Sequence, residues 1–198
     1  AIDENSAGAV IGDLTTSDVD DGDTHTYTVS GLDAASFEVV NGELKLKDSV
    51  TADYETQDSY SVTVTTTDSG ELFTSETFTI TVNDTNDAPT AIALSAKEID
   101  ENSAGVVVGT LSTTDDDVDD THTYTLSGTN AESFEVINNQ LKLQDTVSAN
   151  YEVKDTYSIT VITTDTGRLS TSKVFTITVN DVNDQPVMTL TDTVSLPE

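Results

Sequence analysis

The stretch FTITVND at residues 78–84 occurs a second time, unchanged, at residues 175–181. In both copies Phe, Ile and Val alternate with Thr or Asn, so a strand here would carry all its apolar side chains on one face. A period of two with a single apolar face is typical of half-buried antiparallel strands. The stretch therefore predicts a β-structure and, because it recurs, a repeat.

The spacing between the two copies, 97 residues, holds along the whole chain without a gap. Other stretches that recur at it are IDENSAG (2–8 and 99–105), THTYT (24–28 and 121–125) and SFEV (36–39 and 133–136). Self-similarity at a fixed period indicates a repeat architecture. We therefore divide the chain into an N-terminally truncated repeat 1 (1–87), repeat 2 (88–184) and the start of a third repeat (185–198), and we expect it to be part of a longer array.

Turn signals between the alternating stretches divide each repeat into about seven strands. Asn41-Gly42, for example, separates Phe37–Val40 from Leu44–Leu46, which is a strong hairpin signal. The apolar residues show no helical period. The predicted fold class is all-β, with two tandem seven-stranded Greek-key β-sandwiches of immunoglobulin-like architecture.

Ten of the eleven aromatic residues recur at the same spacing, which favours core packing as their role. The pairs are Tyr27/Tyr124, Phe37/Phe134, Tyr54/Tyr151, Tyr60/Tyr157 and Phe78/Phe175. Phe73 stands opposite Ser170 and has no aromatic counterpart. It is predicted to be exposed in a turn.

The chain has 7 Lys and Arg against 37 Asp and Glu, a formal net charge of −30. This charge excludes nucleic acid and anionic membranes as expected partners, because positive charge drives binding to both. No apolar run is long enough for membrane insertion. Cysteine is absent, so a core, a metal or both must hold the fold. The carboxylates either bind cations or keep the surface soluble.

The acidic residues gather in the expected loops, while the outward strand positions are mostly Thr and Ser. In repeat 1 they are Glu4, Asp18, Asp20, Asp53, Glu55, Asp68, Asp84 and Asp87. Neighbouring carboxylates repel one another unless a cation neutralises them, and a flexible set of oxygen ligands suits Ca²⁺ better than Mg²⁺. Neither the twelve-residue helical calcium loop nor the glycine-rich nonapeptide repeat fits the spacing.

In order and spacing, these acidic elements resemble the calcium motifs of cadherin repeats, over essentially all 198 residues. The matching positions are an early Glu (Glu4), Asp-x-Glu (Asp53, Glu55), Asp-x-Asn-Asp (Asp84, Asn86, Asp87), Asp-x-Asp (Asp115, Asp117) and an Asp that ends the sixth strand (Asp165). Cadherins bind calcium between successive domains. The resemblance therefore implies Ca²⁺ as the cofactor and neighbouring repeats of the same chain as partners.

By this resemblance the ligands fall into three sets. At the junction of repeats 1 and 2 they are Glu4, Asp53, Glu55, Asp84, Asn86, Asp87, Asp115, Asp117 and Asp165. At a preceding junction they are Asp18, Asp20 and Asp68. At a following junction they are Glu101, Asn150, Glu152, Asp181, Asn183 and Asp184. Asp21 and Asp23 fall outside the motifs and are expected to matter less.

The chain departs from the cadherin pattern at three points. Ala88 and Gln185 stand where the cadherin linker has a second Asn, and Asn150 replaces the acidic residue found at Asp53. Trp is absent, so the Trp-mediated docking of vertebrate cadherins does not carry over. The sequence is more similar to the cadherin-like repeats of large bacterial RTX-type surface adhesins. That likeness implies an extracellular extender on a bacterial cell surface, stiffened by Ca²⁺ and acting in cell adhesion and biofilm.

Two other functions compete with this interpretation. No nucleophile–base pair or substrate cleft is evident around His25 or His122, so we expect no enzymatic activity. A calcium-dependent carbohydrate-binding module is the stronger rival, although Phe73 is the one aromatic residue that remains for sugar contact.

Overall fold

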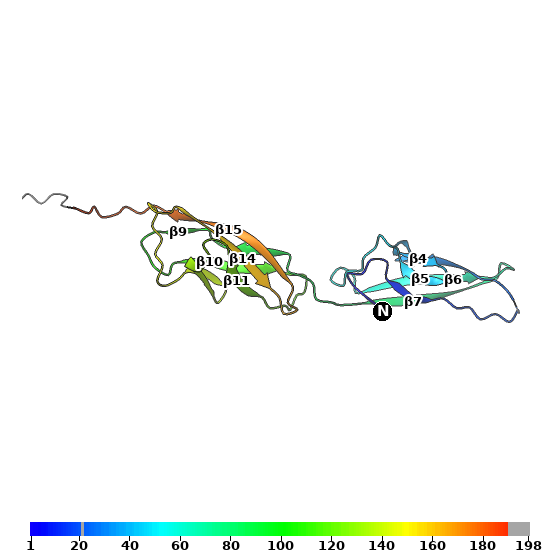
Figure 1. Cartoon of the computed structure of the whole chain (residues 1–198). Coiled ribbons are helices and arrows are strands. Elements are labelled where there is room, and N and C mark those ends of the chain that lie inside the picture. The colour runs from blue at the N-terminus through cyan, green and yellow to red at the C-terminus, as the bar shows by residue number, and fades with distance from the viewer. Residues whose placement is uncertain (21, 190–198) are drawn as a thin grey trace, which may run out of the picture. The chain divides into compact units, whose positions relative to one another are not determined.

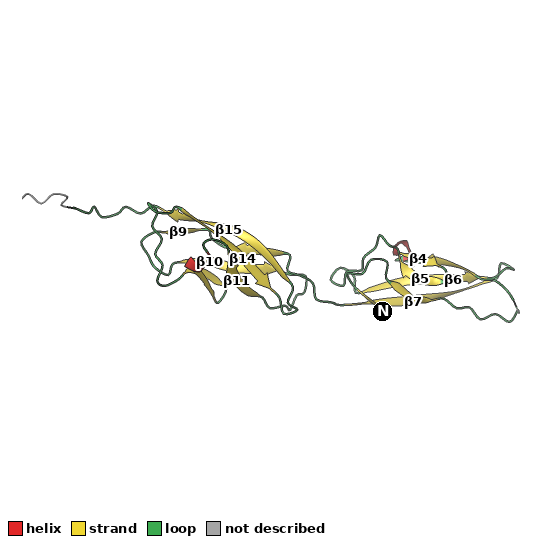
Figure 2. Cartoon of the chain, in the orientation of Figure 1, coloured by secondary structure: helices red, strands yellow, loops and turns green. Residues whose placement is uncertain are grey.

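The computed structural model describes residues 1–20 and 22–189, which form two compact units that divide between Asn86 and Asp87. Both units are built of strands, and helical structure in the described residues is limited to two short 3-10 turns, Ala34–Ser36 and Ala131–Ser133 (Figure 2). None of the helices in this part of the chain has the length and apolar character needed to cross a membrane.

The first unit, in which Figure 1 labels β4 to β7, is a sandwich of a four-stranded and a three-stranded sheet. The strand orders are β1-β7-β6-β3 and β2-β5-β4. β1 pairs parallel with β7, and the other pairs are antiparallel. Its strands are β1 (Ile2–Asp3), β2 (Val10–Asp13), β3 (Thr26–Ser30), β4 (Phe37–Val40), β5 (Glu43–Leu46), β6 (Ser59–Thr67) and β7 (Phe73–Asn83).

The second unit has sheets in the orders β11-β14-β15-β9 and β12-β13-β10-β8. Its strands are β8 (Ala91–Leu94), β9 (Glu98–Asp100), β10 (Val107–Thr114), β11 (Thr123–Ser127), β12 (Phe134–Ile137), β13 (Gln140–Leu143), β14 (Thr156–Thr164) and β15 (Ser170–Asn180). β8 pairs antiparallel with β10, whereas β9 pairs parallel with β15. The two are halves of one first strand that changes sheets, so this unit is also a seven-stranded sandwich.

Each unit has its own apolar core between its two sheets, as the alternating pattern predicts. In β14, Tyr157, Ile159 and Val161 are buried while Ser158 is exposed. Tyr157 packs edge-on against Phe134, with ring centroids 5.4 Å apart and planes at 82°. The first unit repeats this pair with Tyr60 and Phe37, at 5.5 Å and 80°.

Two aromatic residues predicted for the core lie at the surface instead. Tyr54 is 37% exposed and Tyr151 is 40% exposed. Each lies in the loop before a long strand. The backbone N–H of Tyr54 is directed inward and donates to Glu4, and that of Tyr151 donates to Glu101. The loop conformation thus leaves the ring outside. Phe73 is 73% exposed, as predicted, but it is the first residue of β7 and does not lie in a turn. The expected start of a third repeat at 185–198 lies largely outside the described residues.

Candidate metal centres

Each unit carries two clusters of three carboxylates, one at each end of its long last strand. In the first unit Asp68 precedes β7 and Asp84 follows it. Within each cluster, one oxygen from every residue lies within 4.8 Å of the others. We name them after their first residue: the Glu4 cluster (Glu4, Glu55, Asp84), the Asp18 cluster (Asp18, Asp23, Asp68), the Glu101 cluster (Glu101, Glu152, Asp181) and the Asp115 cluster (Asp115, Asp120, Asp165).

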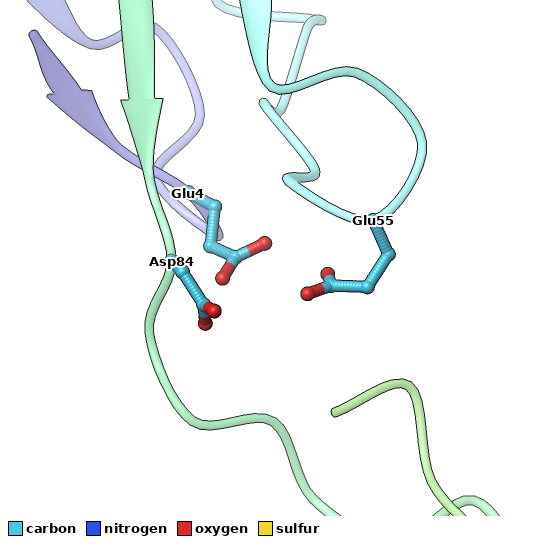
Figure 3. A group of neighbouring side chains, drawn as sticks. All are labelled: Glu4, Glu55 and Asp84. Carbon is cyan, nitrogen blue, oxygen red and sulfur yellow. The ribbon is translucent and has the colours of Figure 1, made fainter. Parts of the chain in front are cut away.

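The Glu4 cluster is organised around a buried carboxylate. Glu4 follows β1 and is only 2% exposed. Its two oxygens accept hydrogen bonds from the backbone N–H groups of Tyr54, at 2.7 Å, and Thr85, at 2.6 Å. Figure 3 shows the Glu55 and Asp84 side chains directed toward the same space as that of Glu4. These two backbone donors fix the orientation of the Glu4 carboxylate within the cluster.

The Glu101 cluster repeats this arrangement in the second unit. Glu101 is 2% exposed and accepts from the backbone N–H groups of Val182 and Tyr151, both at 2.8 Å. These two hydrogen bonds, that of Val182 first, lower the pKa of Glu101 below its ordinary value. The glutamate is therefore a fixed anion near neutral pH.

The Asp115 cluster is the most deeply buried of the four. The Asp115 side chain is 4% exposed and Asp165 is 6% exposed. Asp115 Oδ2 lies 2.7 Å from His122 Nε2, and Asp165 Oδ1 accepts from the Leu169 N–H at 2.8 Å. Oδ2 of Asp120 is buried and has no hydrogen-bond partner in the described part of the chain. Two like charges about 4 Å apart repel by roughly 4 kcal/mol at an effective dielectric constant of about 20.

These features fit a hard cation. A buried carboxylate oxygen without a donor is costly, and a metal ion would relieve both that cost and the repulsion within the cluster. The atoms available as metal ligands in all four clusters are carboxylate oxygens, which Ca²⁺ and Mg²⁺ prefer.

The Asp18 cluster is the counterpart of the Asp115 cluster in the first unit. Asp18 Oδ1 accepts from the Asp20 N–H at 3.0 Å, and its Oδ2 lies 3.1 Å from His25 Nε2. The hydrogen bond from Asp20, followed by that from His25, lowers the pKa of Asp18. Asp68 accepts from the Leu72 N–H at 2.8 Å, and Asp23 accepts from Thr24 and Ser69.

Asp23 and Asp120 are the members that sequence reasoning missed. The cadherin-like motifs leave out Asp23 together with Asp21, which lies outside the described residues. The two differ in one visible respect, because Asp21 corresponds to Val118 whereas Asp23 corresponds to Asp120 at the 97-residue spacing. That recurrence was the signal that could have identified both.

Asp53 and Asn150 are predicted as ligands, but their side chains accept hydrogen bonds from the backbone of their own loops. Asp53 Oδ1 accepts from the Thr56 N–H at 2.8 Å, and Asn150 Oδ1 accepts from the Val153 N–H at the same distance. An amide oxygen serves this turn as well as a carboxylate does. The turn therefore explains how Asn replaces Asp at this position.

The remaining predicted carboxylate ligands are not members of the four clusters. Asp117 Oδ2 accepts from the Asp87 N–H at 2.7 Å within the second unit. Asp184 Oδ1 accepts from the Asn102 side chain at 2.8 Å, and the Asn183 side chain donates to the Asp184 carbonyl at 3.2 Å. Asn86 is the last residue of the first unit.

No protein-family model matches this chain. Among solved structures it is similar to extracellular cadherin domains 1–4 of protocadherin gamma B7, with a TM-score of 0.61, 25% identity, and coverage of 90% of this chain and 46% of that one. It is also similar to EC1-2 of human protocadherin-24, with a TM-score of 0.66, 23% identity, and coverage of 92% and 93%. A third match, PcdhgB3 EC1-4, has a TM-score of 0.66, 24% identity, and coverage of 92% and 47%.

The fold is cadherin-like. The chain spans about half the length of the two four-domain structures and nearly all of the two-domain one. The sequence-based resemblance to cadherin repeats is thus confirmed for the fold.

Proposed function

We propose that this chain is a calcium-binding extender segment of a large extracellular adhesin on a bacterial cell surface. Calcium at the junctions between repeats stiffens the array, which projects a distal binding domain in cell adhesion and biofilm. The observation that carries the proposal is the set of four carboxylate clusters, and above all the buried Asp115 cluster, in which Asp120 Oδ2 has no hydrogen-bond partner within the described part of the chain.

The choice of calcium rests on ligand chemistry and on the cadherin-like motifs. Ca²⁺ accepts six to eight oxygens in flexible geometry, whereas Mg²⁺ requires a near-ideal octahedron and retains water. Extracellular calcium modules bind with dissociation constants of about 10⁻⁴ to 10⁻³ M. Each sandwich has an apolar core of its own. Removing calcium should therefore lower the stability of each unit by mass action without unfolding it.

The bridging role follows from where the proposed ligands occur along the chain. Asp84 belongs to the first unit, whereas Asp87, Asp117 and Asp165 belong to the second. A cation that binds both sets would restrict the joint. We expect small-angle scattering to give a larger and better-defined maximum dimension in millimolar calcium than in chelator.

A pair of variants separates this effect from a general change of charge. Asp84→Asn should weaken the calcium dependence of the scattering curve, while Glu132→Gln, an exposed site away from the clusters, should leave it unchanged. An identical maximum dimension with calcium and with chelator would contradict the extender role.

One observation favours the rival, a carbohydrate-binding module. Leu72 and Phe73 are each 73% exposed, and both line a shallow hollow together with Asp18, Asp68 and His25. An exposed aromatic ring beside a cation site offers an apolar face for contact with a sugar. A glycan array in millimolar calcium tests it, with Phe73→Ser as the control because Ser170 holds this position in the second unit. Reproducible binding that this substitution abolishes would establish the rival.

A further inference from the structure

The hairpin of β4 and β5 in the first unit and that of β12 and β13 in the second have the same turn, built from different residues. Strand pairing leaves two residues in each turn. They are Asn41-Gly42 in the first unit and Asn138-Asn139 in the second. All four have positive φ, +53° and +86° in the first turn and +48° and +61° in the second, as a type I′ turn requires. The second unit therefore shows that this turn forms without glycine.

The Asn41 side chain is open to a reaction that its counterpart resists. Asn41 is exposed, and a Cβ built on Gly42 would meet no atom within 4 Å. The backbone nitrogen that follows an asparagine can attack the side-chain amide carbon, and a side chain on the following residue hinders the approach that glycine permits. Asn41-Gly42 is the one Asn-Gly pair in the sequence. Asn138 is followed by Asn139, which carries such a side chain.

We propose that Asn41 is a site of spontaneous deamidation through a cyclic imide. The Gly42 nitrogen forms a bond to Cγ of Asn41, the bond from Cγ to Nδ2 breaks, and the side-chain nitrogen leaves as ammonia with the proton of the Gly42 amide. Water, the one other reactant, then opens the imide at either of its two carbonyl carbons. The products are aspartate and isoaspartate at this position, and no group is oxidised or reduced. The site is independent of the proposed calcium function.

Isoaspartate would alter the turn, because it adds one carbon atom to the main chain. The Gly42 carbonyl accepts from the Leu14 N–H at 2.7 Å, which ties the turn to the residue after β2. Leu44, two residues further along in β5, is only 2% exposed. A lengthened turn would displace both contacts, so the first unit should lose stability. In the second unit Leu111 donates to the Asn139 carbonyl at 2.7 Å, and this contact should persist.

The test incubates the full chain at mildly alkaline pH for several weeks and follows it by mass spectrometry of proteolytic peptides. We expect the peptide that contains Asn41 to gain the mass of an amide-to-acid exchange, with isoaspartate among the products. The peptide that contains Asn138 is the internal control and should convert about tenfold more slowly, because Asn139 hinders the attack. Equal rates at the two turns would overturn the proposal. Conversion without isoaspartate would also overturn it, because it would indicate direct hydrolysis of the side chain.

Gly42→Asn is the matched variant, since Asn139 holds the equivalent position at φ +61°. It should leave the amide NMR shifts of the β4–β5 hairpin largely unchanged outside the turn. It should also slow the conversion of Asn41 about tenfold, because the attacking nitrogen is then hindered. Conversion at the original rate would show that the Gly42 nitrogen is not the attacking group.

A second measurement separates the effects of the two products. Asn41→Asp supplies the aspartate product with an unaltered backbone, and at this exposed position it should shift the melting temperature little. The isoaspartate fraction of an aged sample, isolated by ion-exchange chromatography, should melt at a lower temperature and show altered amide shifts at Leu14 and Leu44. An isoaspartate fraction that melts like the fresh chain would overturn the predicted loss of stability.

Discussion

Asp120 is the residue whose substitution best tests the Asp115 cluster. Asp120→Asn removes one negative charge from the cluster and keeps the size of the side chain. Because its buried Oδ2 has no hydrogen-bond partner among the described residues, we expect this oxygen to be a direct ligand and the variant to bind calcium about tenfold more weakly, a change of about 1.4 kcal/mol. Calorimetric titration with calcium measures the effect.

The matched control is the neighbouring residue. Asp119→Asn makes the same change of charge at an exposed position, and its counterpart in the first unit is Gly22. It should alter binding by about 0.5 kcal/mol or less, as surface substitutions do. Equal losses from the two variants would indicate a diffuse acidic surface in place of a defined centre.

The sequence identified Asp115 and Asp165, but it did not identify Asp120. The first two belong to motifs with a fixed place relative to a strand, so the strand pattern locates them. Asp120 lies in a loop between β10 and β11, and its approach to Asp165 depends on how that loop folds. Recurrence at the 97-residue spacing singles out Asp117 and Asp120 among the other aspartates of this loop, but it does not show which of the two points inward.

The turn between β9 and β10 is sensitive to a change of backbone. Gly105 has φ of +67°, and a Cβ there would lie 2.7 Å from Asp145 Oδ1. Moving this carboxylate aside would break the hydrogen bond that Lys142 donates to the same oxygen at 2.7 Å. Gly105→Ala should therefore destabilise the second unit by about 1 kcal/mol or more, through strain and contact together. Thermal unfolding followed by circular dichroism measures it.

Gly70 provides the control for this substitution. It lies outside the left-handed region, and a Cβ there would meet its nearest atom at 3.4 Å. Gly70→Ala should shift the melting temperature little. A shift as large as that of Gly105→Ala would show that neither the positive φ nor the close approach matters.

The elements themselves were largely predictable, because strands with one buried face must alternate. The division of the first strand into β8 and β9 was not. Ala91–Leu94 and Glu98–Asp100 both alternate, and neither pattern shows which sheet a segment will join. That choice depends on the partner that is available, β10 for β8 and β15 for β9, which is a tertiary property.

For the whole molecule, the governing quantity is the net charge of −30. Without calcium, repulsion within the four clusters adds to the general repulsion of the surface and opposes the compact state. Salt screens exposed charges, since the Debye length falls from about 10 Å at 0.1 M to about 3 Å at 1 M. We therefore expect the melting temperature in chelator to rise when NaCl is raised over this range.

The same NaCl titration in millimolar calcium should raise the melting temperature less, because bound ions already neutralise the clusters. Salt competes weakly for carboxylates that bind Ca²⁺ from several sides. The chain with Asp120→Asn should respond in chelator less than the unaltered chain, since one of the repelling charges is gone. Differential scanning calorimetry at low and high NaCl, in calcium and in chelator, resolves these effects. A melting temperature that is independent of salt in chelator would mean that the clusters carry no repulsive cost, and the argument that they require a cation would fail with it.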